Sequence, residues 1–190
     1  MSAVSFSTFA ELMDHEFTNT TQKIEKIGYK VDGKGIKSHC SCTTLKSVDY
    51  FHEIEGDMIF IEFSDLESQK SQQAILIDEL KKSGMGKGTI RLFVKELHKS
   101  ISVEMRKKYI DSIHILRCMN GKIVDVPEWA SNRDKGKYVI VVAPLPELSP
   151  KEKRIELLRL LDKLESDLTL SIPEPLFSGV KVMPLDKFIN

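Results

Sequence analysis

The stretch DYFHEIEGDMIFIEFSDLE, residues 49–67, decides how this sequence is read. Two runs rich in β-forming residues, 48–54 and 58–63, flank a Glu-Gly-Asp turn, a pattern that predicts an antiparallel hairpin. Asp49 begins the first strand, and Glu62 lies among Ile and Phe residues in the second. Glu62 either belongs to a site or points to solvent from an edge strand. Alternation places it on the same face as Phe60, which favours the site.

Length and composition are those of a globular protein. The chain has 190 residues, 41% of them hydrophobic and 29% charged, enough for one domain with a substantial core. No apolar run reaches the roughly 20 residues that span a bilayer, and the N-terminus lacks the basic-then-apolar pattern of a signal peptide. We therefore expect a single cytoplasmic domain that does not contact a membrane.

Charge and cysteine content narrow the function classes further. The 28 basic and 28 acidic residues cancel, which counts against indiscriminate nucleic-acid binding but not against a local basic face. Three cysteines make a poor disulfide framework and fit a reducing compartment. His39, Cys40 and Cys42 are close in sequence, but no second Cys/His pair follows at a zinc-site distance. Free or buried thiols are favoured over a zinc site.

Hydrophobic periodicity and capping signals predict an alternation of helices and strands along the whole chain. Thr8 and Glu11 have the spacing of a capping box, and so do Ser64 and Glu67, with Gly84 as the stop of the second helix. A longer helical region leaves open a break near residues 99–102. The expected elements are a helix over 8–27, the hairpin, helices over 65–83 and 89–119, a buried strand over 137–146, a helix over 149–168 begun by Ser149, Pro150 and Glu152, and a last strand over 180–185.

The hairpin resembles the core of the PD-(D/E)xK nuclease superfamily, the fold of restriction endonucleases. In that family an Asp begins one strand, a Glu or Asp lies in the next strand, and a Lys follows two residues later. Asp49 and Glu62 match the two acids in VDYFHEIEGDMIFIEFSDLE. The resemblance covers roughly residues 8–83. It implies an α/β fold with a restriction-endonuclease-like core and a mixed sheet, in which a central hairpin is flanked by helices.

The resemblance also implies chemistry. Asp49 and Glu62 would together hold Mg²⁺ or Mn²⁺ through carboxylate oxygens, and the family's lysine would orient the attacking water. This sequence has Ser64 where that lysine is expected. Lys70, in the following helix, or Lys46, before the first strand, are the candidates to replace it. The catalytic set expected here is therefore Asp49, Glu62 and Lys70, with Lys46 as the other option.

Basic residues supply candidate contacts to nucleic acid. The segment KKSGMGKGTIRL departs from a phosphate-binding loop, because Lys81 stands where a Gly is required and Gly88 where Ser or Thr is required. We interpret it as a Gly-rich connector whose Lys81, Lys82 and Lys87 could contact phosphate.

Further along the chain, Arg106 and Lys107 lie in a basic helical stretch with Lys108. They could face a nucleic-acid backbone, although a solvated helix face balanced by Glu96 and Glu104 is favoured. Trp129, in a polar loop, is expected to be a packing anchor, or a binding hot spot if exposed.

The sequence thus predicts one α/β domain over residues 1–190, with a nuclease-like core over about 8–145 and a C-terminal helix and strand over about 149–190. The expected function is metal-dependent hydrolysis of phosphodiester bonds in nucleic acid, or nucleic-acid binding through a degenerate site. The alternative is a non-catalytic module that binds a partner protein, as inhibitor and anti-defence proteins of phages and other mobile elements do. The sequence leaves open whether the protein is a homodimer.

Overall fold

Residues 50–64 form the hairpin that the sequence predicts. In this computed structural model, which describes residues 3–131, 135–144 and 151–190, β4 (Tyr50–Ile54) pairs with β5 (Asp57–Ser64) in antiparallel register. Between the strands, Glu55 and Gly56 have φ angles of 55° and 81°. Positive φ at both central residues is the geometry of the type I′ turn, whose twist matches that of the strands it connects.

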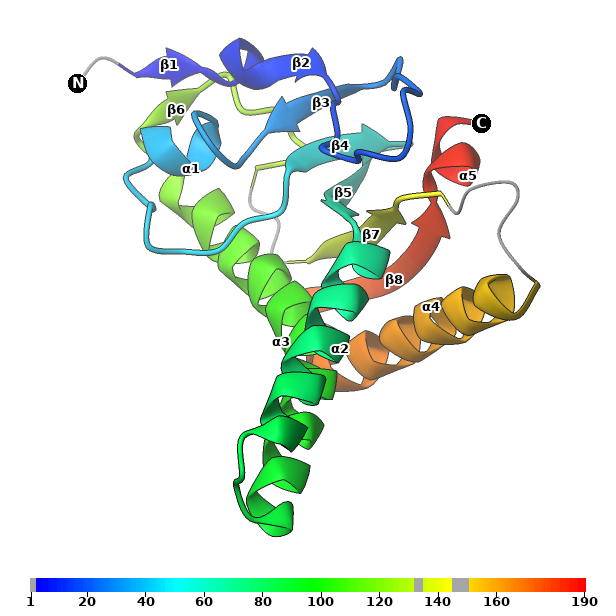
Figure 1. Cartoon of the computed structure of the whole chain (residues 1–190). Helices are drawn as coiled ribbons and strands as arrows, with labels where there is room; N and C mark the ends of the chain where they lie inside the picture. The colour runs from blue at the N-terminus through cyan, green and yellow to red at the C-terminus, as the bar shows by residue number, and fades with distance from the viewer. Residues whose placement is uncertain (1–2, 132–134, 145–150) are drawn as a thin grey trace.

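The hairpin is the centre of a mixed six-stranded sheet in the order β2-β3-β4-β5-β7-β8. From β2 to β5 each strand is antiparallel to the next. The strand β7 is parallel to both of its neighbours, β5 and β8. Parallel neighbours need long crossovers, and helices supply them here (Figure 1). The remaining sheet strands are β2 (Ala10–Leu12), β3 (Ile27–Lys30), β7 (Gly136–Val142) and β8 (Phe177–Pro184).

Helices and short elements complete the described chain. Crossovers are formed by α2 (Leu66–Lys82) and α3 (Lys87–Cys118) between β5 and β7, and by α4 (Lys151–Ser171) between β7 and β8. A separate two-stranded parallel pair consists of β1 (Val4–Ser5) and β6 (Ile123–Val124). The shorter helical elements are η1 (Phe6–Phe9), α1 (Ile36–His39), η2 (Glu174–Leu176) and α5 (Leu185–Ile189). The mixed α/β class predicted from the sequence is confirmed.

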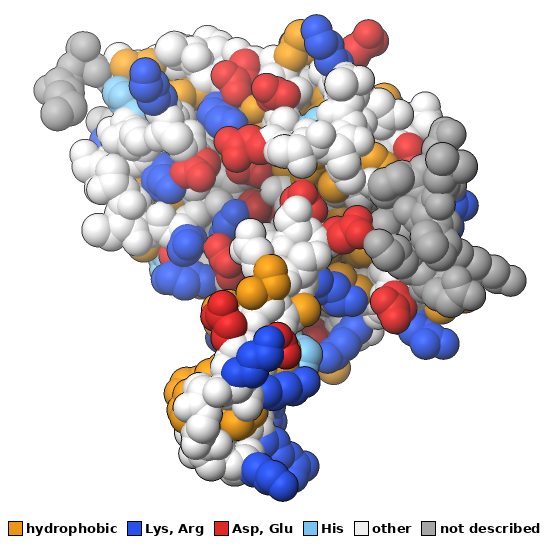
Figure 2. All heavy atoms as spheres, in the orientation of Figure 1, with side chains coloured by type: hydrophobic (Ala, Val, Ile, Leu, Met, Phe, Trp, Pro, Cys, Tyr) orange, Lys and Arg blue, Asp and Glu red, His pale blue; other side chains and the backbone are white. Residues whose placement is uncertain are grey.

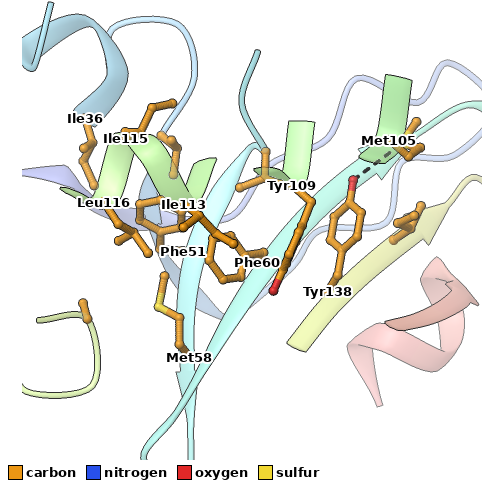
Figure 3. Packing of buried hydrophobic residues seen from close by; sticks show 14 of the residues in the cluster. Ile36, Phe51, Met58, Phe60, Met105, Tyr109, Ile113, Ile115, Leu116 and Tyr138 are labelled. Atoms are coloured by element: carbon orange, nitrogen blue, oxygen red, sulfur yellow. Dashed lines mark hydrogen bonds between the residues drawn. The ribbon is translucent and has the colours of Figure 1, made fainter. Parts of the chain in front are cut away.

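Both faces of the sheet are buried, since alternate side chains of each strand point to opposite sides. On one face, Phe51, Phe60 and Tyr138 pack against Met105 and Tyr109 of α3 (Figure 3). The opposite face carries a second apolar cluster covered by the segment before β3 and by α5. This second cluster comprises Met13, Phe17, Ile24, Tyr50, Ile59, Ile61, Val141, Ala143, Leu185 and Phe188.

The helix predicted over residues 8–27 is wrong. The segment forms η1, the edge strand β2 and irregular structure up to β3. Its apolar residues divide between the two cores: Phe9 packs on the α3 side, and Met13, Phe17 and Ile24 pack on the other. Their spacing therefore imitates a helical stripe although no single helix face is buried. The Thr-Asn-Thr-Thr run at 18–21 also has low helix propensity.

Three other predictions concern helix boundaries. The N-cap of α2 is Asp65, whose carboxylate accepts from the Ser68 N–H at 3.0 Å, so Ser64 as the cap is wrong. No break occurs near residues 99–102, because α3 is continuous over 32 residues, about 48 Å of helix. The predicted cap at Ser149 and Pro150 lies outside the described residues. None of the described helices is both long and apolar enough to cross a lipid bilayer.

Together, α2 and the first half of α3 form an arm, defined here as residues 66–103. Leu66 and Ile101, both near the base, are its buried residues. The arm extends well beyond the sheet, as Figure 1 shows. The Gln73 side-chain amide connects its helices, donating to the Leu97 carbonyl at 2.9 Å and to the Ser100 hydroxyl at 3.0 Å.

Candidate active site

Asp49 and Glu62 lie opposite each other across the hairpin. The Asp49 N–H donates to the Ile61 carbonyl at 3.0 Å, and the next residue, Tyr50, is the register partner of Ile61. This register places Asp49 beside Glu62, on the sheet face that α3 covers. One oxygen of Asp49, Oδ2, accepts from the Phe63 N–H at 2.8 Å. The two carboxylates singled out in the sequence therefore meet in the fold.

Lys108 of α3 completes this cluster. Its Nζ donates to Oε1 of Glu62, and only 2% of the Glu62 side chain and 20% of the Lys108 side chain are exposed. The other carboxylate oxygen, Oε2 of Glu62, is buried and has no hydrogen-bond partner among the described residues. A buried oxygen without a partner is costly. Glu62 thus keeps one buried acceptor oxygen unpaired, while its other oxygen accepts from Lys108.

The electrostatics of the two acids reflect their burial. Burial raises the pKa of Glu62 well above its ordinary value, and the negative charge of Asp49 raises it further, while Lys108 opposes both effects. The pKa of Asp49 is also raised by burial, although the hydrogen bond from Phe63 and the charge of Lys108 oppose the rise. Burial is the main cause of both raised pKa values, and the nearby positive charge offsets it only in part.

Lys108 by itself supplies only part of that charge. Burial lowers the pKa of Lys108, but the charges of Glu62, Asp49 and Glu104 outweigh burial and leave the pKa raised, so the side chain is an ammonium. Glu104 lies one turn before Lys108 and has its own partner, with Lys46 Nζ at 3.4 Å from Glu104 Oε1. Lys108 consequently serves both Glu62 and the half-buried Asp49. The charge of Lys30 also acts on Asp49.

The lysine positions predicted from the sequence are placed elsewhere. Lys70 lines a cavity between α2, α3 and α4 together with His98 and Glu156. Lys46 is exposed and pairs with Glu104 at the edge of the cluster. Ser64 shares the face of Glu62, as alternation predicts, and its hydroxyl accepts from the Gln69 amide at 3.1 Å. Of these lysines, Lys108 alone contacts Glu62.

Asp49 and Glu62 are the carboxylates of this cluster that could hold a divalent cation. Among the described residues, no group of three or more His, Cys, Asp and Glu side chains is arranged to hold a metal ion. Mg²⁺ usually keeps several of its waters and is bound through one or two carboxylates. Asp49 and Glu62, with the unpartnered Oε2, meet that smaller requirement. In the part of the chain that the structure describes, His39, Cys40 and Cys42 also do not belong to a group arranged to hold zinc.

Those cysteines have an ordinary structural role. Cys40 and Cys42 are buried free thiols, and burial raises the pKa of Cys40 to about 11. Trp129 is half-buried and packs against Phe6 and Tyr29, with ring centroids 5.7 and 5.4 Å apart. It is a packing anchor, the first of the two roles that the sequence left open.

The predicted nucleic-acid contacts lie in two separate places. Lys81, Lys82 and Lys87 lie at the far end of the arm, about 29 Å of helix from Arg106 near its base. Lys107 pairs with the nearly buried Asp111 at 2.9 Å. The five side chains therefore do not form one face, and the two groups could not touch the same short stretch of backbone.

Sequence reasoning missed the role of Lys108, although it noted the basic stretch that contains it. One signal could have identified it: Lys108 follows Ile101 and Met105 on the stripe of α3 that packs against the sheet. A lysine on a stripe that is otherwise buried needs a partner, and an unexplained acid in a buried strand is the natural one.

Comparisons with known proteins do not add to this geometry. The sequence matches no protein-family model and no curated protein, and the structure matches no solved structure.

Proposed function

We propose that this protein is a metal-dependent nuclease in which Asp49 and Glu62 bind the cation and Lys108 replaces the missing motif lysine. One observation carries the proposal: a buried glutamate oxygen without a partner lies beside a second carboxylate and a buried ammonium. Such a cluster is expensive to keep in a fold for stability alone. Strongly perturbed acids next to a lysine are typical of catalytic centres.

The topology supports the same proposal. Three antiparallel strands, β3, β4 and β5, are followed by a helical crossover to a strand parallel to β5. The resemblance to the PD-(D/E)xK superfamily implies a mixed sheet with a central hairpin flanked by helices, and the hairpin with Asp49 directly before β4 and Glu62 in β5 lies in a mixed sheet. The helix that the resemblance places before the hairpin is absent from residues 8–27, where η1 and β2 stand instead. The lysine comes from a crossover helix rather than from β5.

Each side chain has a definite task in this proposal. A cation bound by Asp49 and Glu62 would polarise the scissile phosphate and lower the pKa of water. The Lys108 ammonium, fixed by Glu62, would direct the attacking water and stabilise the negative charge that develops on the phosphoryl oxygens. The Phe63 N–H holds Asp49 in place through its Oδ2 contact, leaving Oδ1 for the cation.

The test is cleavage of labelled duplex DNA, single-stranded DNA and RNA with Mg²⁺, with Mn²⁺ or with a chelator. We expect metal-dependent cleavage by the wild-type chain and none by Glu62→Gln, because the amide keeps the shape but loses the charge that holds the metal. Lys108→Met should bind metal but cleave at least about 10²-fold more slowly, the range for loss of one electrostatic catalytic group. Lys107→Met, one residue away, is the matched control and should cleave normally.

A second function is favoured by one contact. The Lys108–Glu62 bond partly neutralises the cluster without any metal, as a structural ion pair would. In that case the chain is a non-catalytic module that binds nucleic acid or a partner protein. The test is a double variant, Asp49→Ala with Glu62→Ala. If it keeps the protein's biological activity and no substrate is cleaved, the non-catalytic module is favoured over the nuclease.

A further inference from the structure

The far end of the arm carries a concentration of positive charge. Residues 80–95 contain five Lys and Arg residues and no Asp or Glu, although acids and bases balance over the whole chain. Charge is therefore separated along the molecule, with an excess of cations at the tip. Figure 2 shows Lys and Arg side chains gathered there, beside a group of exposed hydrophobic atoms.

Helical spacing places most of these cations on one flank of the arm. On α2, Lys70 and Ile77 line the cavity next to α4, and Lys81 follows Ile77 after one helical turn. On α3, His98 lines the same cavity, and Arg91 and Lys95 precede it with the i, i+4, i+7 spacing of a single stripe. The two helices thus present their cations toward the same side.

That flank continues into a groove between the arm and α4. A cavity of about 440 Å³ lies there, to which α4 contributes Arg159 and Lys163. The acids Glu67, Glu156 and Asp167 also line this region, so the inner end of the groove is mixed in charge. The positive excess lies in its outer part, along the arm.

The outer cations lack partners. Lys82 and Lys99 pair with Asp78 and Glu96 on their own helices. Four others, all exposed, form no ion pair among the described residues: Lys81, Lys87, Arg91 and Lys95. A solvated helix face usually balances its charges with i, i+4 acids, and this stripe has none on its own part of the arm.

We propose that the arm is a second, metal-independent binding site for the phosphate backbone of nucleic acid. A straight row of unpaired cations beside a groove is complementary to a chain of phosphates. On α3, the unpaired Lys87, Arg91 and Lys95 cover about 12 Å, between three and four phosphates of one strand at about 3.4 Å each. We choose nucleic acid among the possible polyanions because of the proposed function. The row of positive charge is observed independently of that function.

The arm site is distinct from the cleavage centre. His98, on the groove flank, lies ten residues before Lys108 of the carboxylate cluster, about 15 Å along α3. Asp49, Glu62 and Lys108 are not among the residues that line the groove. The arm would therefore retain nucleic acid without taking part in the chemistry.

The test measures fluorescence anisotropy of a labelled 20-bp DNA duplex, its single strand and the matching RNA, with chelator present. The arm variant combines Lys81→Ala, Lys87→Ala, Arg91→Ala and Lys95→Ala. The control variant removes the same charge from exposed lysines elsewhere, by alanine at Lys23, Lys34, Lys181 and Lys187. We expect the arm variant to bind at least about tenfold more weakly and its salt slope to fall by about 4, while the control keeps wild-type affinity.

Each outcome separates this inference from the proposed function. No binding by the wild-type chain, or equal loss in the arm and control variants, overturns the arm site whether or not the protein cleaves. Binding through the arm by a protein that never cleaves supports the arm site and removes the nuclease. Preference among the duplex, the single strand and RNA identifies the natural source of the backbone. Binding of the arm to phosphatidylserine vesicles but not to nucleic acid would assign the tip to an anionic membrane surface instead and overturn the inference.

Discussion

Replacement of Lys108 by Met tests the buried ion pair through stability alone. Methionine keeps most of the apolar stem but removes the ammonium, which leaves both Glu62 oxygens without a donor in a side chain that is 2% exposed. Removing one partner of a buried pair typically costs about 3–5 kcal/mol when the remaining group stays charged. If Glu62 is protonated instead, the loss is that of a hydrogen bond, about 1 kcal/mol.

The cost should therefore depend on pH, with a defined sign. Unfolded Glu62 titrates near 4.5, and burial raises its folded pKa well above that value. Between the two pKa values the folded state binds the extra proton, so stability falls as pH rises. Without Lys108 the folded pKa rises further, and the fall continues to higher pH. The difference between wild type and Lys108→Met should grow from about 1 kcal/mol at pH 5 to about 3 kcal/mol at pH 8.

The assay is equilibrium urea unfolding at both pH values with chelator present. Lys107→Met is the matched control, because its side chain is 55% exposed and its partner, the nearly buried Asp111, keeps the hydrogen bond from the Lys46 N–H at 2.8 Å, so this variant should cost less than Lys108→Met at pH 8. Glu62→Gln in the Lys108→Met background should recover stability at pH 8, since no charge then remains to be buried. A Lys108→Met variant as stable as the control, or equally destabilised at both pH values, would refute the reasoning.

Two further predictions concern the packing that holds the site. Tyr109→Phe should cost about 1–3 kcal/mol by urea unfolding, because the buried hydroxyl donates to the Leu176 carbonyl at 2.7 Å and accepts from the Gly136 N–H at 3.1 Å; a cost below about 0.5 kcal/mol would contradict this role. Gly136→Ala should destabilise by at least about 1–3 kcal/mol, since its Cβ would lie 2.6 Å from the Met58 carbonyl oxygen and 2.7 Å from the Phe60 ring; an unchanged melting temperature would show that β5 and β7 are less tightly packed than described.

The hairpin, β7 and β8 were predictable because their signals are local. Alternating apolar residues around Glu55 and Gly56, the apolar run over 137–146 and the final strand each specify a strand within a few residues of sequence. The segment over 8–27 failed for a physical reason: its apolar residues are buried in two different cores by tertiary contacts that local periodicity does not report.

Of the candidate site, only the two carboxylates, which are close in sequence, could be predicted. Asp49 and Glu62 are joined by one tight hairpin, so their spacing in sequence determines their meeting in space. Lys108 reaches Glu62 across 46 residues, and the long crossover fixes its position through the packing of Met105 and Tyr109 on the sheet. No spacing rule connects residues separated in this way, which is why nearby Lys70 and Lys46 were the natural candidates.

Calorimetric titration with Mn²⁺ tests the central claim most directly, because it measures the carboxylate pair without requiring a known substrate. Wild-type protein and Lys108→Met should each bind a single ion, whereas Asp49→Asn and Glu62→Gln should lose that binding, since each removes one of the two charged ligands. Folded wild-type protein that binds no Mn²⁺, or Glu62→Gln protein that binds it as tightly as wild type, would contradict the claim that Asp49 and Glu62 form a metal centre.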